Sequence, residues 1–143
     1  MSKISTHFYL EEFVPKELFS KFGDKSIWFI DQRIIDISEV LRQRFNKAVI
    51  INNWHSSGAF NNRGFRMPDC PIGGFLSQHK RGNAIDVNVG DLTPQEVYKD
   101  LIENFSIYSK AGLTAIEDIA FTTGWCHIDT RLTKQDSLLI VKP

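Results

Sequence analysis

The sequence has no long apolar run, no excess of charge of either sign and only two cysteines. None of its hydrophobic stretches can span a bilayer, and the N-terminus lacks the basic and then apolar pattern of a secretory signal. Lys plus Arg and Asp plus Glu both number 17, so net charge gives no reason to expect nucleic acid or a membrane surface as a partner. We therefore expect a soluble monomer, made in the cytoplasm, that acts elsewhere only if it is delivered or released.

The two cysteines, Cys70 and Cys126, are too few for a disulfide framework in a chain of 143 residues. Cys126 precedes His127 in a predicted strand, where successive side chains point to opposite faces. Both are therefore interpreted as ordinary thiols. Because 42% of the residues are hydrophobic, residues 1–143 can form one domain with a sizeable core.

Three segments carry the periodicity and end signals of helices. Residues 15–22 begin with a proline and precede a glycine, and residues 26–45 have apolar side chains at three- and four-residue steps. Residues 94–105 follow a capping box formed by Thr93 and Glu96. These segments are expected to pack their apolar faces on a sheet.

Five segments are rich in β-branched and aromatic residues, as strands are. The pattern predicts a central strand in residues 48–54, a buried strand in 84–89, a hairpin of 113–121 with 125–131, and an edge strand in 137–141. Between the first two strands, about twenty residues have no periodicity, which is typical of a functional loop. That loop contains Arg63 and Arg66, and we expect at least one of them to contact substrate.

The segment from Ser77 to Asp86 places a histidine, His79, seven residues before a carboxylate in a buried strand. A bare charge at Asp86 is costly unless it is paired or bound to a metal. His127 lies on a second strand, and two histidines with one carboxylate form a three-ligand zinc set with an open fourth position. We therefore expect Zn²⁺ on His79, Asp86 and His127. The alternative is a pair of hydrogen-bonded core histidines.

Zinc of this kind lowers the pKa of a water molecule to about 7 and polarises a carbonyl, and peptide hydrolysis also needs a general base. Glycine at the third position of residues 122–124 favours a three-residue turn, which pairs Glu117 with Asp129 on the face of His127. A two-residue turn would shift the register by one and present Asp118 instead. We expect Glu117 to be the base, Asp118 to be the alternative, and Asp129 to orient a ligand histidine.

These residues also form a recognisable pattern. Ser77-x-His79-x-x-Gly82-x-Ala84-x-Asp86, followed by Trp125-x-His127-Ile128-Asp129, resembles the motifs of the zinc D-Ala-D-Ala peptidase family. That family includes vancomycin-resistance dipeptidases, peptidoglycan carboxypeptidases and bacteriophage endolysins. The resemblance runs from the helix in residues 26–45 through Arg131.

The resemblance implies zinc on the three expected ligands and a catalytic role for Arg66, because Gly64-Phe65-Arg66 is similar to the family's Gly-Tyr-Arg. The family's arginine steadies the substrate carbonyl and the oxyanion of the transition state. Ser77 and Trp125, within the motifs, are expected to contact substrate together with Arg63. The implied fold is α+β: a single domain with a central, mainly antiparallel sheet, helices on one face and the zinc site on the other.

The implied activity is hydrolysis of peptidoglycan stem peptides, as in a phage endolysin or virion enzyme acting on the cell wall. One departure matters. Several members have a Glu or Asp base three residues before the second histidine, where this chain has Gly124. Either Glu117 takes that role from across the hairpin, or the chain is a catalytically inactive, zinc-containing module that binds the cell wall or has a structural role in a phage.

Overall fold

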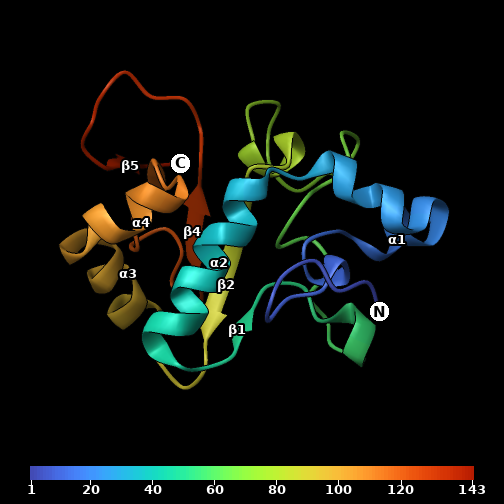
Figure 1. Cartoon of the computed structure of the whole chain (residues 1–143). Helices are drawn as coiled ribbons and strands as arrows, with labels where there is room; N and C mark the ends of the chain where they lie inside the picture. Colours follow the sequence, from blue (N-terminus) through green and yellow to red (C-terminus); the bar gives the residue numbers. More distant parts are fainter.

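A five-stranded mixed sheet organises the chain (Figure 1). Its strands, in the order β1-β2-β4-β3-β5, are β1 (Val49–Ile50), β2 (Ala84–Val89), β4 (Cys126–Asp129), β3 (Ala115–Glu117) and β5 (Leu139–Val141). All neighbours are antiparallel except β3 and β5. The computed structural model describes residues 1–143, and it confirms the predicted α+β class with a mainly antiparallel sheet.

The two faces of the central strands differ in polarity because successive side chains on a strand alternate. On one face, Ile85 and Ile128 are fully buried in the main apolar core. Three helices cover this face and contribute to the same core: α2 (Gln32–Phe45), α3 (Pro94–Glu103) and α4 (Phe105–Ala111). The opposite face carries Asp86, His127 and Asp129. The helices and the expected metal ligands therefore lie on opposite faces of the sheet.

The predicted helices in residues 15–22 and 94–105 are present as α1 (Lys16–Phe22) and α3. The capping box of α3 is formed as expected, with Thr93 accepting from the Glu96 backbone and Glu96 accepting from the Thr93 backbone. The helix α4, which follows a break at Asn104, lies in a segment for which no helix was predicted. Its Tyr108 ring is fully buried against the core.

The predicted helix in residues 26–45 begins too early. Residues Gly23–Phe29 form a 3₁₀ helix, and the chain is extended at Ile30 before α2 begins. The break has a physical cause at Asp31, whose side chain accepts the Arg33 backbone N–H at 2.9 Å and caps α2. The Asp31 backbone N–H donates to Gly82 O at 2.8 Å, which ties the start of α2 to the turn before β2.

The predicted central strand in residues 48–54 is wrong in length and place. Only Val49–Ile50 pair, and β1 is an edge strand. Asn52 and Asn53 leave the sheet because their backbone N–H groups donate to Glu12 O and Phe60 O, both at 3.0 Å. The predicted edge strand at the end of the chain is confirmed as β5.

The hairpin between β3 and β4 has a longer connection than predicted. Ala115 pairs with Asp129 and Ile116 with Ile128, so Glu117 lies opposite His127 and not opposite Asp129. Asp118 ends β3, because its side chain accepts the Ala120 N–H at 3.0 Å and its carbonyl accepts the Phe121 N–H. The register differs from the predicted one by two residues, which leaves Glu117 on the face of His127.

The buried thiol of Cys126 lies on the helix-covered face, as its alternation with His127 predicted. Its S–H donates to Pro94 O at 3.1 Å, and burial raises its pKa to about 12. Cys70 is a second free thiol, partly exposed in the loop before β2. Among the helices, none is both long and apolar enough to cross a membrane.

Gly82 ends the short helix before β2 with a φ of 76°, in the left-handed region. A Cβ there would lie 1.8 Å from Phe29 O, so the substitution Gly82→Ala meets both backbone strain and a steric clash. We expect it to lower the free energy of unfolding by about 2–5 kcal/mol, measured by denaturant titration.

The matched control is Gly124→Ala, because Gly124 has no positive φ and no atom within 4 Å of an added Cβ. It should leave the unfolding free energy within about 0.5 kcal/mol of wild type. Equal stability of the two variants would contradict the close approach of the Gly82 turn to Phe29.

Candidate metal centre

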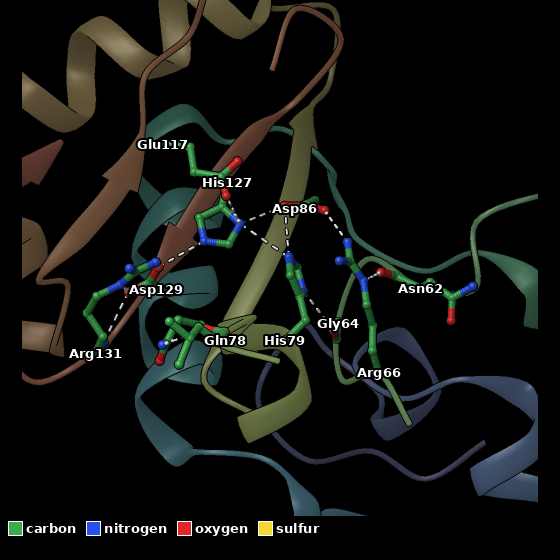
Figure 2. A network of polar contacts seen from close by, with 11 residues as sticks. Asn62, Gly64, Arg66, Gln78, His79, Asp86, Glu117, His127, Asp129 and Arg131 are labelled. Carbon is green, nitrogen blue, oxygen red and sulfur yellow. Dashed lines mark hydrogen bonds and ion pairs between the residues drawn. The ribbon is translucent and has the colours of Figure 1, made fainter. Parts of the chain in front are cut away.

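Three buried side chains from three segments meet on the polar face of the sheet (Figure 2). His79 comes from the 3₁₀ helix η4 (Gln78–Arg81), Asp86 from β2 and His127 from β4, where it is the register partner of Asp86. His79 Nε2 and His127 Nδ1 lie 3.2 and 3.0 Å from Asp86 Oδ1, and 3.2 Å from each other. The structure thus brings together the three ligands that the sequence predicted.

The other nitrogen of each imidazole has an acceptor of its own. His79 Nδ1 lies 2.8 Å from Gly64 O, and His127 Nε2 lies 2.8 Å from Asp129 Oδ2. Because a carbonyl and a carboxylate only accept, these nitrogens carry the protons of the neutral rings. His79 Nε2 and His127 Nδ1 then direct lone pairs at each other and at Asp86 Oδ1. Three mutually facing acceptors are unfavourable unless a cation lies between them.

The electrostatics of these groups also favour positive charge at this point. Burial disfavours the charged form of His127, but hydrogen bonds with Asp129 and Asp86 outweigh it and raise its pKa to about 9. Burial likewise opposes ionisation of Asp86, yet His79 and His127 hold the pKa of that carboxyl well below its usual range. A proton on one imidazole or a metal ion among the three ligands satisfies the same requirement.

The size and type of the site fit a small, nitrogen-binding ion. A tetrahedral ion with bonds of about 2.0–2.1 Å separates its ligands by about 3.3–3.4 Å. The three ligand atoms are 3.0, 3.2 and 3.2 Å apart, so a small movement outward suffices. Calcium prefers six to eight oxygen ligands at longer distances. These residues can hold a metal ion of the first transition series or zinc.

Asp129 and Arg131 fix the orientation of His127. Asp129 is fully buried, and burial alone would raise its pKa, but hydrogen bonds from Arg131 and His127 lower it. Arg131 donates from Nε to Oδ1 at 2.9 Å and from Nη2 to Oδ2 at 2.5 Å, a two-pronged contact. Asp129 thus lies against His127, on the face where the sequence placed it. Arg131 was not among the predicted site residues, although its spacing of two residues from Asp129 would have placed both on one face.

Of the two candidate bases, only Glu117 reaches the ligands. Its Oε1 lies 3.8 Å from His127 Nδ1, the nitrogen that faces the centre of the triad. Asp118 points its carboxylate at its own turn, where it accepts the Ala120 N–H. Gly124, three residues before His127, offers only its carbonyl, which accepts from Asn88 Nδ2 at 2.9 Å.

The long loop before β2 brings Arg66 to the triad. Arg66 Nη2 lies 3.2 Å from Asp86 Oδ2, and its Nε donates to Asn62 O at 2.7 Å. Backbone hydrogen bonds hold this loop in place, from Arg66 N to His79 O and from Asp86 N to Arg63 O. Arg63 has different partners: its guanidinium lies 3.6 Å from the centre of the Phe60 ring and forms a hydrogen bond to Asn88.

Two hollows of about 290 Å³ each flank the triad, and Arg66 lines both. We name them after their tryptophan and glutamate. The Trp125 hollow is lined by Asp86 and by aromatic, apolar and polar side chains that include Phe60, Arg63, Ile72 and Trp125. The Glu117 hollow is lined by His127 and by Ser77, Gln78, Glu117, Arg131 and Val141. The predicted substrate residues Ser77 and Trp125 therefore line different hollows.

We expect the purified protein to bind about one divalent metal ion per chain, because the three buried acceptors converge on one point. His79→Ala and His127→Ala should each abolish stoichiometric binding, measured by elemental analysis after dialysis. His7→Ala is the matched control, since His7 is an exposed residue paired with Glu39. Undiminished metal in both triad variants would exclude these ligands.

The chain was compared with family models, with curated protein sequences and with solved structures, and none of them matches it. Its resemblance to the zinc D-Ala-D-Ala peptidases therefore rests on the quoted motifs. The candidate metal centre rests on its own geometry, in which His79, Asp86 and His127 converge and their remaining polar atoms are bonded to Gly64, Arg66 and Asp129.

Proposed function

We propose that this chain is a zinc-dependent peptidase that hydrolyses peptide bonds in the stem peptides of bacterial peptidoglycan. One observation supports the proposal above all. The three buried candidate ligands lie together between two hollows, with the carboxylate of Glu117 and the guanidinium of Arg66 beside them. Three protein ligands would leave the fourth position of a tetrahedral ion free for water, as catalytic zinc sites require. The motifs shared with the D-Ala-D-Ala peptidases favour the cell-wall substrate.

Zinc in this site would lower the pKa of the attacking water to about 7 and polarise the scissile carbonyl. The chain supplies the proton transfers. Glu117 Oε1 can accept a proton from the attacking water and donate it to the leaving amine. Its position opposite His127 and 3.8 Å from the ligand nitrogen supports this role. The carboxylate that related sequences carry three residues before the second histidine thus has a counterpart on the neighbouring strand.

Arg66 is suited to bind the scissile carbonyl oxygen and the negative charge that develops on it. A guanidinium has five N–H donors, of which Asn62 O and Asp86 Oδ2 occupy two. The remaining donors lie beside the triad, where both hollows meet. Donors that are already oriented and partly shielded from water stabilise a transition-state oxyanion more than free donors do.

The same geometry supports one alternative function. A carboxylate 3.8 Å from a ligand nitrogen is also close enough to bind the metal ion itself after a small movement. Glu117 would then fill the fourth position, and the centre would be a closed, structural one. The chain would in that case be an inactive, zinc-containing module that binds the cell wall or serves a structural role.

Hydrolysis separates the two functions. Zinc-loaded protein incubated with purified peptidoglycan should release new amino and carboxyl termini, identified by mass spectrometry. Glu117→Gln keeps the size of the side chain but removes the basic oxygen, so it should retain zinc and lose most of the hydrolysis. Asp118→Asn is the matched control and should remain active. An inert wild type whose zinc is lost in Glu117→Gln would establish the closed, structural centre.

Arg66→Ala should lower turnover by about 100- to 1000-fold without loss of zinc, because one oxyanion donor is removed and the three ligands remain. Steady-state kinetics on a defined stem peptide and elemental analysis provide the two readouts. Arg63→Ala serves for comparison: the Arg63 guanidinium packs on Phe60 and bonds to Asn88 in the Trp125 hollow, so its loss should affect KM more than kcat. A large loss of kcat in Arg63→Ala with normal kcat in Arg66→Ala would reverse the two roles.

A further inference from the structure

A surface that combines exposed aromatic rings with basic side chains lies where α1, the 3₁₀ helix Gly23–Phe29 and η4 meet. We propose that this surface binds an anionic lipid bilayer at the level of the headgroups. None of its residues belongs to the candidate metal centre, so the inference goes beyond the proposed function and does not depend on it. We call it the aromatic-basic surface, and its principal residues are Lys21, Phe22, Trp28, Phe75, Lys80 and Arg81.

Two further hollows make the aromatic-basic surface continuous. The larger, of about 550 Å³, is lined by residues of α1, of Gly23–Phe29 and of η4, and Trp28 is among them. The second, of about 460 Å³, is lined by Phe75 from the loop before β2. Lys80 and Arg81 line both hollows. The two rings therefore belong to one surface and share two cations.

The apolar side chains of this surface are mostly in contact with solvent. Trp28 is 76% exposed and Phe75 is 89% exposed, and Phe22 and Phe29 keep about two fifths of their surface exposed. Apolar groups also line the larger hollow beneath these rings, namely Leu18, Phe65 and Met67. An exposed apolar patch of this kind marks an interaction site. A fluid bilayer buries side chains that stand out from a surface without the complementary shape that a folded partner would need.

The charged side chains of the same surface are all positive. Lys21, Lys80 and Arg81 line the hollows, no acidic residue does, and the ion pairs of the chain involve other cations. Lys25 adds a fourth charge, with its Nζ 5.9 Å from the centre of the Trp28 ring. The net charge of the whole chain is zero and does not reveal this local excess. Four cations beside exposed rings are complementary to anionic headgroups over hydrocarbon.

This combination favours a bilayer over two other occupants. A second copy of the chain would bring the same four cations against each other in a symmetric contact, which is repulsive. A single-stranded nucleic acid would use the rings and the cations, but it would not use the aliphatic and thioether groups of Leu18 and Met67. Lipid satisfies both features, because acyl chains contact the apolar groups while phosphates reach the cations.

The test is sedimentation of the purified chain with vesicles of phosphatidylcholine alone and with vesicles of equimolar phosphatidylcholine and phosphatidylglycerol. The wild type should bind the anionic vesicles and should be released by high salt. Each basic residue near an anionic surface contributes about a fivefold increase in affinity, so Lys21→Glu with Lys25→Glu should lower the partition coefficient by about 25-fold or more. Trp28→Ala with Phe75→Ala should lower it by about 10-fold, because two exposed rings no longer insert.

Matched controls change exposed residues that line neither hollow. Lys110→Glu with Lys134→Glu alters the net charge equally, and Phe121→Ala with Leu132→Ala removes as many exposed apolar side chains. Both should bind anionic vesicles as the wild type does.

Tryptophan emission reports the depth of Trp28. It should shift to shorter wavelength when anionic vesicles are added to the wild type. Trp28→Phe should still sediment with the vesicles but lose that shift, although Trp54 and Trp125 remain.

Three outcomes would overturn the inference. The first is equal binding of anionic and neutral vesicles, or no binding of either. The second is an equal loss of binding in the control variants and in the variants of the aromatic-basic surface. The third is a different occupant: a dimer that Trp28→Ala with Phe75→Ala dissociates, or a single-stranded oligonucleotide that vesicles do not displace. Vesicle binding requires no hydrolysis, so each result stands whether or not the chain cleaves peptidoglycan.

Discussion

The structure depends on the charge of one buried carboxylate. Asp86 lies in the middle of β2, 5% exposed, where an unpaired charge costs several kcal/mol. Its two oxygens have partners from three other segments: His79 from the turn before β2, His127 from β4 and Arg66 from the long loop. Each partner requires its own segment to approach the strand. The contacts that compensate the charge of Asp86 therefore also assemble the candidate metal centre.

Backbone hydrogen bonds convert the long loop into part of the scaffold. Asp86 N donates to Arg63 O, Arg66 N donates to His79 O, and Gly64 O accepts from the His79 ring. The loop has no periodicity, yet it is fixed on both sides of the triad by these contacts. This explains how a segment without regular structure can hold the guanidinium of Arg66 close to the carboxylate of Asp86. A displacement of about 1 Å at such a position would lower the rate of a catalysed reaction.

The sequence predicted those features that follow from strand alternation and local end signals. The three candidate ligands came from their residue types, their order along the chain and the strand placement of Asp86 and His127. The face of Glu117 came from strand alternation, and it was right even though the register was wrong by two residues, because an even shift preserves it. The late start of α2 and the short β1 depend on contacts between distant segments, from Asp31 to Gly82 and from Asn52 to Glu12, which periodicity does not encode. Arg131 was not predicted because the local pattern indicates that Asp129 and Arg131 share a face but not that Asp129 is buried and needs a cation.

The two thiols occupy very different surroundings, which has a consequence for labelling. Cys126 is buried on the helix-covered face, and its pKa of about 12 leaves almost no thiolate near neutral pH. Alkylating dyes will therefore react with Cys70, and mixed disulfides will form there. Cys70 lies in the same loop as Arg63 and Arg66. A single fluorophore can thus be attached next to Asn62, which lines the Trp125 hollow, without an engineered cysteine and without altering a residue of the triad.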